Sequence, residues 1–318
     1  MSTYRSVGIS VGHVTPQEVL TELEPVVGEL LERHLATAKE WFPHEHVPYG
    51  RGRDFDHDHV WSEADTDIGG GELSDGVRSA LFVNLLTEDN LPYYFRDIER
   101  MLGSDGAFGE WTRRWTAEEG RHSIAIRDYL TATRAVDPVV LERARMAQVS
   151  GGQVPQPMSA LAGIVYVSLQ ELATRIAHRN TGKLIGDPAG YDVMARVAAD
   201  ENLHHLFYRD LTAAAIEASP SDLVIAIEAV VRTFAMPGTG IPDFERHSAA
   251  IAAAGIYDVA MFHEQVLVAV VIKQWRIPEL TGLTAEAETA RDALLSRIER
   301  VGKLASKMAA RRERASVS

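Results

Sequence analysis

Two four-residue stretches, EGRH at 119–122 and ENLH at 201–204, decide the fold that this sequence predicts. Each places a histidine three residues after a glutamate, and residues three apart on a helix project from the same side. Each helix can therefore offer one carboxylate oxygen and one imidazole nitrogen to a common point. Either motif alone is weak evidence, because a Glu-x-x-His spacing is expected by chance in a chain of this length and composition.

The surroundings of the two motifs match each other. Glu88, in LFVNLLTEDNL, precedes Glu119 by 31 residues, and Glu171, in IVYVSLQELAT, precedes Glu201 by 30. Both of these earlier glutamates lie in stretches of apolar or small residues with helical spacing. The sequence therefore predicts a helix pair that occurs twice in the chain. Each of the four helices turns one glutamate toward the interior.

Four inward glutamates and two histidines form the ligand set of ferritin-like di-iron carboxylate bundles. Hard carboxylates with one imidazole per metal suit iron or manganese, and the O2 chemistry of such sites favours iron. If no cation were bound, burying these carboxylates would be costly. We therefore predict two irons per chain. The predicted ligands are Glu88, Glu119, His122, Glu171, Glu201 and His204.

Composition narrows the functional classes. The 318 residues include no cysteine, which excludes thiolate-bound clusters and cysteine nucleophiles. Lys and Arg number 32 against 45 Asp and Glu, and the net charge of -13 argues against nucleic acid as a main partner. No apolar run approaches the length of a membrane span, and the first residues lack the apolar core of a signal peptide. We expect a cytoplasmic protein.

Helical spacing dominates the chain and strand signals are weak, so we predict an all-α fold: a four-helix bundle with additional flanking helices. No shift in composition marks a linker, which favours a single domain over residues 1–318. The basic C-terminal tail, about 303–318, is expected to be a frayed helix end. Helices are expected at about 16–39, 73–102, 111–133, 139–149, 158–180, 188–219, 221–235, 243–254, 257–275 and 284–312.

The stretches LLTEDNLPYY, RRWTAEEGRH, YVSLQELATRIAHRNTGK and AADENLHH resemble helix motifs of the soluble acyl-acyl carrier protein desaturases, in their actinobacterial, mycobacterial-type branch. The resemblance covers most of the chain. It implies that the six predicted ligands hold a di-iron centre, with Glu119 and Glu201 as bridging carboxylates. One departure is Gly120, at a position where the family usually has a polar Asn; this costs about 1 kcal/mol of helix propensity.

The same resemblance implies roles around the metals. Asp200 matches an aspartate that accepts a hydrogen bond from the first histidine ligand, and Trp41 matches a tryptophan at the outer end of that chain. Thr174 matches a threonine on the oxygen-binding side. His205 follows His204 but points about 100° away around the helix, so we expect it outside the ligand set.

The function implied is O2-dependent desaturation of a fatty acyl chain carried on acyl carrier protein, which leaves a cis double bond. A ferredoxin or similar donor would supply electrons, and the family implies a homodimer. Two alternatives share the ligand set: a di-iron hydroxylase or N-oxygenase acting on a carrier-bound intermediate, and a non-catalytic iron-binding protein. Arg175, Arg179 and Lys183 recur at helical spacing and are predicted to contact the acidic carrier.

Overall fold

The computed structural model describes residues 16–56, 58–67, 73–154, 156–238 and 240–317, and in these residues it contains helices and no strand. The all-α prediction is therefore confirmed. The elements in chain order are α1 (Pro16–Thr37), α2 (Pro43–His46), η1 (Tyr49–Arg51), η2 (Glu63–Asp65), α3 (Asp75–Glu88), α4 (Leu91–Leu102), α5 (Gly106–Ala132), α6 (Pro138–Gly151), α7 (Ala160–Leu184), α8 (Pro188–Ala218), α9 (Pro220–Thr233), α10 (Phe244–Ala253), α11 (Val259–Met261), η3 (Phe262–Gln274), η4 (Ile277–Glu279) and α12 (Ala285–Val317).

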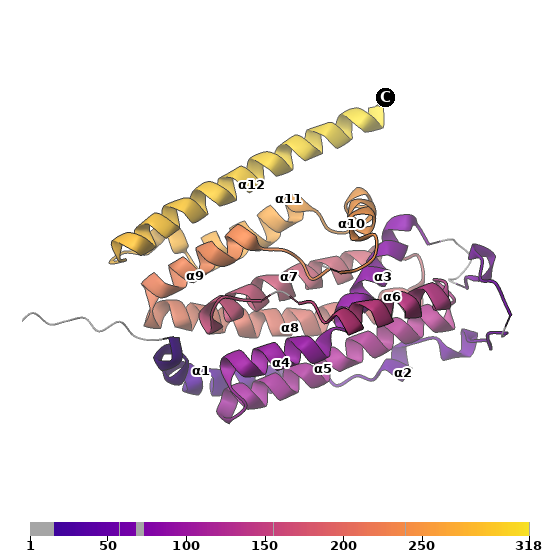
Figure 1. Ribbon diagram of the computed structural model, residues 1–318, viewed down its shortest axis with the longest axis horizontal. Helices are drawn as coiled ribbons and strands as arrows, with labels where there is room; N and C mark the ends of the chain where they lie inside the picture. Colours follow the sequence, from indigo (N-terminus) through magenta and orange to yellow (C-terminus); the bar gives the residue numbers. More distant parts are fainter. Residues whose placement is uncertain (1–15, 57, 68–72, 155, 239, 318) are drawn as a thin grey trace, which may run out of the picture.

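Four of these helices, α3, α5, α7 and α8, form the bundle that carries the predicted ligands. The most extensive helix–helix interface joins α7 to α8. Helix α1 packs on α5 and α8, and α4 packs on α5 and α7. Helices α9 and α12 and the π-helix η3 form a further layer on the α7 side (Figure 1). The flanking helices that the sequence predicted are therefore present on two sides of the bundle.

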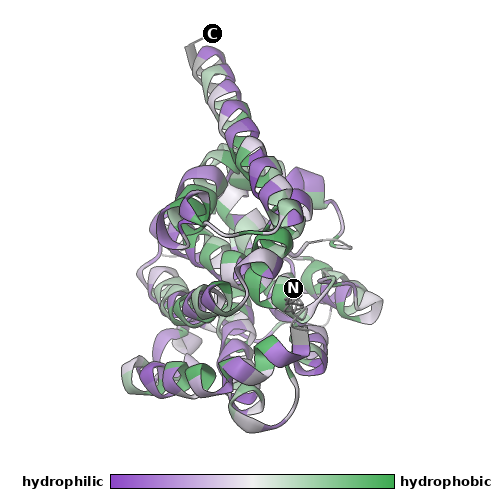
Figure 2. Cartoon of the chain, turned by 90° about the vertical axis from the view of Figure 1, so that its left-hand side faces the viewer, coloured by the Kyte–Doolittle hydropathy of each residue, from purple (hydrophilic) through white to green (hydrophobic). Residues whose placement is uncertain are grey.

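Three of the four bundle helices, α3, α7 and α8, begin at residues whose side chains cap them. Ser74 and Ser159 accept hydrogen bonds from the backbone N–H groups of Val77 and Ala162, which stabilises the starts of α3 and α7. Asp187 caps α8, whose first residue is proline. Apolar faces of these helices meet in the interior, as the hydropathy colouring shows (Figure 2). These caps set where α3, α7 and α8 start, and packing sets which face each helix buries.

The predicted helix over 73–102 is wrong as a single element. The structure ends α3 at Glu88, turns through Asp89 and Asn90, and starts α4 at Leu91. Pro92 explains the break, because it has no N–H to donate to the carbonyl of Glu88 four residues earlier. The break leaves Glu88 as the last residue of its helix.

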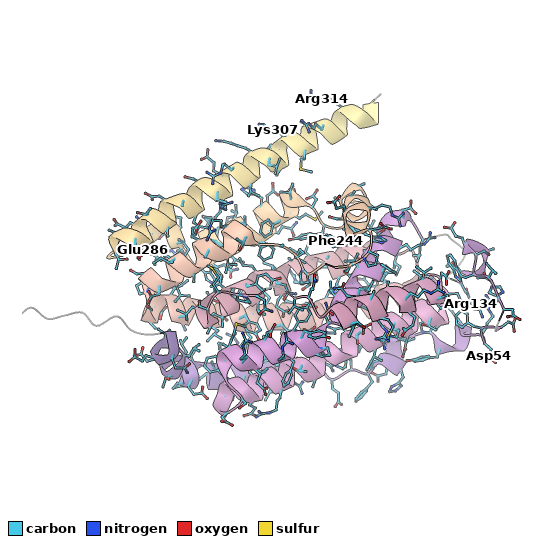
Figure 3. The ribbon with its side chains drawn as sticks, viewed as in Figure 1. Asp54, Arg134, Phe244, Glu286, Lys307 and Arg314 are labelled. Atoms are coloured by element: carbon cyan, nitrogen blue, oxygen red, sulfur yellow. The ribbon has the colours of Figure 1, made fainter. Side chains whose placement is uncertain are left out.

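Two other elements differ from the prediction. In place of one α-helix over 257–275, α11 is followed by the π-helix η3, whose wider turns are seen in the bond from the Trp275 N–H to the Val270 carbonyl (2.8 Å). Helix α12 continues through Val317, so the fraying of its end stays a prediction. Its last turns, with Lys307 and Arg314, project from the body of the protein (Figure 3).

Long loops close the opposite end of the bundle. Arg134, which has a positive φ of 52° at the end of α5, donates to the backbone carbonyl of Asp54 (2.6 Å) and lies 4.1 Å from the Phe55 ring centroid (Figure 3). Trp61 donates to the Arg134 carbonyl (3.0 Å). These bonds fix the chain between α2 and α3 on the end of α5.

Candidate metal centre

The structure brings the six predicted ligands together in the centre of the bundle. Glu88 comes from α3, two ligands come from α5, Glu171 comes from α7 and two come from α8. All six are buried; the most exposed, Glu88, is 8% exposed. Their donor atoms form two overlapping groups, and within each group all atoms lie within 4.8 Å of one another. The groups are Glu88, Glu119, His122 and Glu201, and Glu119, Glu171, Glu201 and His204.

Glu119 and Glu201 belong to both groups, so each could bridge two metals. The Nδ1 atom of His122 lies 3.3 Å from Glu119 Oε2 and 3.6 Å from Glu201 Oε1. The Nδ1 atom of His204 lies 2.8 Å from Glu119 Oε1 and 3.8 Å from Glu171 Oε2. Both imidazoles therefore present the same nitrogen, Nδ1, to the shared carboxylates.

The donor set fits two divalent cations. Glu119 Oε1, His122 Nδ1, Glu171 Oε2 and His204 Nδ1 are buried and make no hydrogen bond of good geometry, although His204 Nδ1 lies 2.8 Å from Glu119 Oε1. Buried polar atoms are rarely left unsatisfied, and here all four face the same cluster. Two divalent ions would balance the four carboxylate charges and satisfy these atoms. Oxygen-rich ligation with one imidazole per ion suits iron or manganese.

The electrostatics of the six predicted ligands also favour positive charge at the cluster. Burial and the negative charge of Glu201 raise the pKa values of Glu119 and Glu171 above their usual range. Burial lowers the pKa of His204, but its contacts with Glu118 and Glu119 outweigh this and raise that pKa well above its usual value.

The other nitrogen of His122 begins a chain of polar groups. Its Nε2 lies 3.3 Å from Asp200 Oδ2, which also accepts from the Trp41 indole N–H (2.9 Å) and from Arg121 (2.9 Å). The Arg121 guanidinium lies 4.9 Å from the Trp41 ring centroid. An acceptor on Nε2 fixes the ring so that Nδ1 faces the metals. Asp200 and Trp41 therefore lie where the predicted outer chain needs them.

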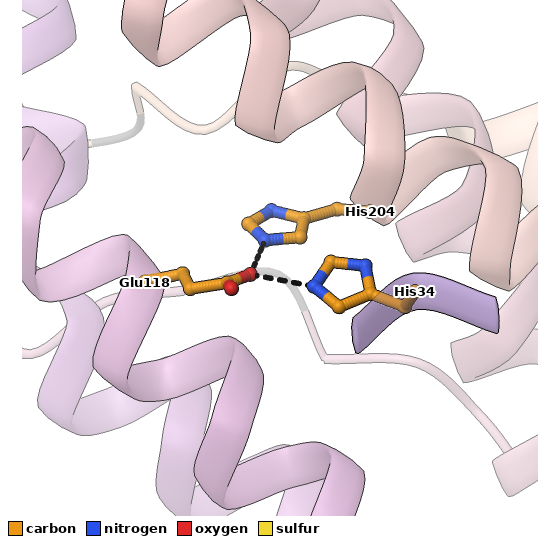
Figure 4. A group of neighbouring side chains, drawn as sticks. All are labelled: His34, Glu118 and His204. Carbon is orange, nitrogen blue, oxygen red and sulfur yellow. Dashed lines mark hydrogen bonds and ion pairs between the residues drawn. The ribbon is translucent and has the colours of Figure 1, made fainter. Parts of the chain in front are cut away.

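A matching chain starts at His204. Glu118 Oε2 accepts from the Nε2 atoms of both His204 and His34, each at 2.9 Å (Figure 4). Burial raises the pKa of Glu118, but the bonds from these two histidines outweigh it and hold that pKa well below its usual range. The three residues also have the spacing of a metal site. Because His204 Nδ1 already faces the central cluster, we interpret Glu118 as the partner that orients His204.

Two further oxygens of the ligand carboxylates accept hydrogen bonds from side chains. Trp115 donates its indole N–H to Glu171 Oε1 (3.1 Å), and Thr174 donates to Glu201 Oε2 (2.8 Å). The Thr174 hydroxyl is also 3.0 Å from the Glu171 carbonyl of its own helix. Thr174 therefore contacts a predicted metal ligand directly.

A narrow cavity of about 60 Å³ touches the cluster. We call it the inner cavity. Glu88, Glu119, Glu171, Glu201 and Thr174 form its metal side, and its other wall is largely apolar. That wall includes Tyr94, Ile98, Met101, Val154, Pro157, Tyr166 and Val167. An alkyl chain can therefore approach the carboxylates along this wall.

Comparison with known proteins agrees with this geometry. The family model described as fatty acid desaturase matches residues 15–318. The chain belongs to the fatty acid desaturase family. DesA1 of Mycobacterium tuberculosis, named as an acyl carrier protein desaturase, is 43% identical over 289 residues, which cover 88% of this chain and 84% of DesA1. The predicted family is thus confirmed.

More distant relatives carry related names. A chloroplastic stearoyl-acyl carrier protein 9-desaturase of Gossypium hirsutum is 28% identical over 94% of this chain and 80% of its own length. The X-ray structure of DesA2, an acyl carrier protein desaturase of Mycobacterium tuberculosis by its title, superposes with a TM-score of 0.68 at 27% identity. That superposition covers 83% of this chain and 96% of DesA2.

Sequence reasoning missed several residues of this desaturase site, Glu118 and His178 among them. Glu118 directly precedes Glu119, as Asp200 directly precedes Glu201. This repeated pair of acidic residues in the sequence could have indicated that Glu118 plays the same part as Asp200. His178, two helical turns after Glu171, is 1% exposed, and its Nε2 lies 3.3 Å from Glu88 Oε1 and 3.5 Å from Glu201 Oε1. Its Nδ1 lies 3.1 Å from the Asn84 side-chain nitrogen.

His205 lies outside the ligand groups, as its position on the helix predicted. Its Nδ1 contacts the Ser168 carbonyl (2.8 Å) between α8 and α7. Burial lowers the pKa of His205 to about 4, so the ring is neutral at physiological pH. Gly120 has no side-chain neighbour closer to its ideal Cβ position than Leu91 Cδ2, at 4.0 Å. The desaturase thus has space for a side chain at that position.

Proposed function

We propose that this protein is an acyl-acyl carrier protein desaturase that removes two hydrogens from adjacent methylenes of a fatty acyl chain and leaves a cis double bond. The observation that carries the proposal is the contact between the six-ligand cluster and an apolar cavity. When bound, two irons would supply the O2-dependent oxidant that unactivated C–H bonds require. The names of the relatives support desaturation over the alternatives.

The chain's own residues hold and orient this centre. Glu119 and Glu201 can serve both metals, and Asp200 and Glu118 fix the histidine rings through their outer nitrogens. The apolar wall of the inner cavity excludes water and positions the alkyl chain. Thr174, which binds Glu201 at the cavity edge, is proposed to act on the oxygen-binding side.

The test is reconstitution with iron, a ferredoxin, its reductase and a panel of acyl carrier protein substrates, followed by product mass. Desaturation predicts a product two hydrogens lighter than the substrate. A product one oxygen heavier would favour the hydroxylase alternative, and turnover of no acyl substrate would contradict the proposal. Glu119→Gln is the matched control, because it changes one bridging oxygen and should give no product.

We propose iron as the metal and two ions per chain as the stoichiometry. The two overlapping donor groups support this count, and the acidic, imidazole-poor donor set supports iron. Metal analysis of the purified protein tests both. A single tightly bound zinc ion, or an iron content that cannot be raised above one ion per chain, would contradict the assignment.

The electron donor is proposed to dock at a basic pocket of about 460 Å³ that has Trp41 and Asp200 in its wall. Lys39, Arg175, Arg179 and Arg196 line this pocket, and in the described part of the chain none of them forms an ion pair with a carboxylate. Burial, and to a smaller extent the charge of Arg179, lower the pKa of Arg175. An acidic redox protein would complement this charge.

This placement bears on the predicted carrier contact. Arg175 and Arg179 line the basic pocket, whereas Tyr166, Gln170 and Thr174 of the same helix line the inner cavity. The basic residues of α7 therefore lie beside the Trp41 chain, and a carrier contact there stays a prediction. Arg179→Glu should raise the apparent KM for ferredoxin and make it less salt-dependent, while the KM for the acyl substrate stays unchanged. A raised KM for the acyl substrate with an unchanged KM for ferredoxin would instead support docking of the carrier protein at Arg175 and Arg179.

Two further expectations stay predictions: the homodimer and the cytoplasmic location. Among the described helices, none is long and apolar enough to cross a membrane. The oligomeric state is tested by sedimentation of the iron-loaded protein.

A further inference from the structure

The last turns of α12 hold a row of basic residues that the proposed reaction does not use. From residue 300 to the end of the sequence, six residues are Lys or Arg and one is acidic, although the whole chain has a net charge of -13. The part of α12 that contains Lys307 and Arg314 extends beyond the bundle (Figure 3). Positive charge is therefore concentrated on a projecting element of an otherwise acidic protein.

These basic residues lie on one face of the helix. They follow one another at intervals of three or four residues, which places side chains on the same side of an α-helix. Each is exposed. Arg314 lies about 180° around the helix from the buried Ala305, so the row faces away from the body of the protein. We call this row the cationic stripe; its members are Arg300, Lys303, Lys307, Arg311 and Arg314.

Most of the cationic stripe has no acidic partner within the protein. Lys303 pairs with Glu299 of the same helix (2.6 Å), but no other member forms an ion pair with a carboxylate among the described side chains. Arg314 donates its Nε–H to the backbone carbonyl of Ala310 (3.1 Å). Like charges one turn apart destabilise a helix. A partner that supplies negative charge along the stripe would remove this repulsion.

Two exposed apolar side chains beside the stripe indicate the kind of partner. Leu304 and Met308 lie one turn apart and are 51% and 37% exposed. Helices that lie in a membrane surface need a long apolar face, usually with aromatic residues. The described side chains from residue 300 onward expose only these two large apolar groups. A few apolar contacts bordered by charge are typical of an interface between proteins, so the stripe fits an acidic protein better than a lipid surface.

The position of α12 indicates which acidic protein this is. The proposed reaction needs an electron donor and an acyl carrier protein. The basic pocket beside Trp41 is lined by α7, α8 and residues at the end of α1, and its described lining includes no residue of α9 or α12. The inner cavity, by contrast, includes Pro237 from the segment that follows α9, and α12 packs along α9 on this side of the bundle (Figure 1). The carrier must deliver its alkyl chain to that cavity, so the stripe suits the carrier.

We infer that the cationic stripe of α12 is the docking surface for the acyl carrier protein, with Leu304 and Met308 as apolar contacts beside the charges. The inference rests on the proposed function for the identity of the carrier. It places the two acidic partners on separate surfaces, the donor at the basic pocket and the carrier on α12. The acylated carrier can then stay bound while the donor delivers electrons.

The test measures equilibrium binding of acyl carrier protein loaded with a saturated acyl chain to iron-loaded enzyme without reductant, at low and high salt. Lys307→Glu with Arg311→Glu reverses two exposed charges of the stripe. We expect the Kd to rise about tenfold at low salt and the difference to shrink at high salt, because screening weakens interactions between surface charges. Iron content and the KM for ferredoxin should stay unchanged. Arg100→Glu with Arg113→Glu, at exposed positions on α4 and α5, makes the same change in net charge and is the matched control.

Three results would overturn the inference. If both double variants weaken carrier binding equally, only the net charge of the enzyme matters. If neither weakens it, the carrier docks elsewhere. If the stripe variant spares carrier binding but raises the KM for ferredoxin, or loses a wild-type affinity for phosphatidylglycerol vesicles, the stripe binds the donor or a lipid surface. A wild-type enzyme that binds no acyl carrier protein would contradict the proposed function as well, whereas carrier binding that survives charge reversal contradicts this inference alone.

Discussion

The two halves of the metal centre come from the same repeated pattern but are set in different surroundings. In the first half, Glu88 is the last residue of a helix that stops at a proline-induced break, and His122 connects through Asp200 to Trp41. In the second, Glu171 lies in the middle of a 25-residue helix, and His204 connects through Glu118 to His34.

The outer ends of the two chains differ most in charge. The cations beside His34 are balanced: Arg33 and Arg209 each lie 2.6 Å from Asp210. The cations that line the pocket beside Trp41 are not paired with carboxylates among the described residues; they are Lys39, Arg175, Arg179 and Arg196. The repeat thus explains why both halves hold a metal, and the unrepeated residues explain why only one half faces a pocket suited to an acidic partner.

The largest expected effect is on the residues that both halves share. Glu201→Ala should remove most bound iron and abolish activity, because one carboxylate serves both donor groups. Iron content by metal analysis checks this. His205→Ala is the matched control on the same helix: it should lower stability through the lost Ser168 contact but keep the iron. If His205→Ala loses as much iron as His204→Ala, the ligand assignment on α8 is wrong.

The second prediction separates the two outer chains. Asp200→Asn and Glu118→Gln each change the acceptor of one histidine ligand, and such changes typically cost about 10- to 100-fold in activity or metal affinity. We expect turnover with ferredoxin to fall more for Asp200→Asn than for Glu118→Gln, because Asp200 lines the basic pocket and Glu118 does not. Equal losses in both variants would show that the two chains serve only to orient the histidines.

The donors to the two terminal carboxylates give a third prediction. His178 contacts Glu88, and Trp115 donates to Glu171. Removing the Trp115 hydrogen bond to a charged carboxylate costs roughly 1.5–3 kcal/mol, and removing the His178 imidazole deprives Glu88 of its ion-pair partner at 3.3 Å. Trp115→Phe should therefore weaken chiefly the iron held by Glu171, whereas His178→Gln, which also removes the contact with the shared Glu201, should affect both irons, as seen in the spectrum of protein loaded with isotopically enriched iron. Identical spectral changes in both variants would contradict the separation of the halves.

The smallest effect concerns the residue between glutamate and histidine in each motif. The first half has Gly120 where the second has Asn202. Gly120→Ala should stabilise the protein by about 1 kcal/mol through helix propensity, because there is space for the added Cβ. Denaturant unfolding measures this, and iron content should not change. A loss of stability would mean that the helix needs the glycine for close packing.

The positions of the ligands could be predicted because each depends on local spacing. Glu119 and His122 share a helix face whatever the rest of the chain does, and the same is true of Glu201 and His204. The matching intervals from Glu88 and Glu171 then related the two halves. The outer partners Asp200 and Trp41 required the family resemblance, since they lie 159 residues apart in sequence.

What could not be predicted depends on tertiary packing. The π-helix η3 has no signal in an apolar run that also fits an α-helix. His34 lies 84 residues from Glu118, and no spacing relates them. The inner cavity is formed in part by loops, such as those with Val154 and Pro237, whose positions follow from the folded chain. Pro92, by contrast, was a readable signal that the helix after Glu88 must break.

The most direct test of the account is Mössbauer spectroscopy of wild-type protein loaded with isotopically enriched iron, combined with iron analysis. The account predicts two irons per chain in equal amounts and in two distinct environments, because the repeated ligands are alike and their partners are not. One iron per chain, or a single mononuclear signal, would contradict it.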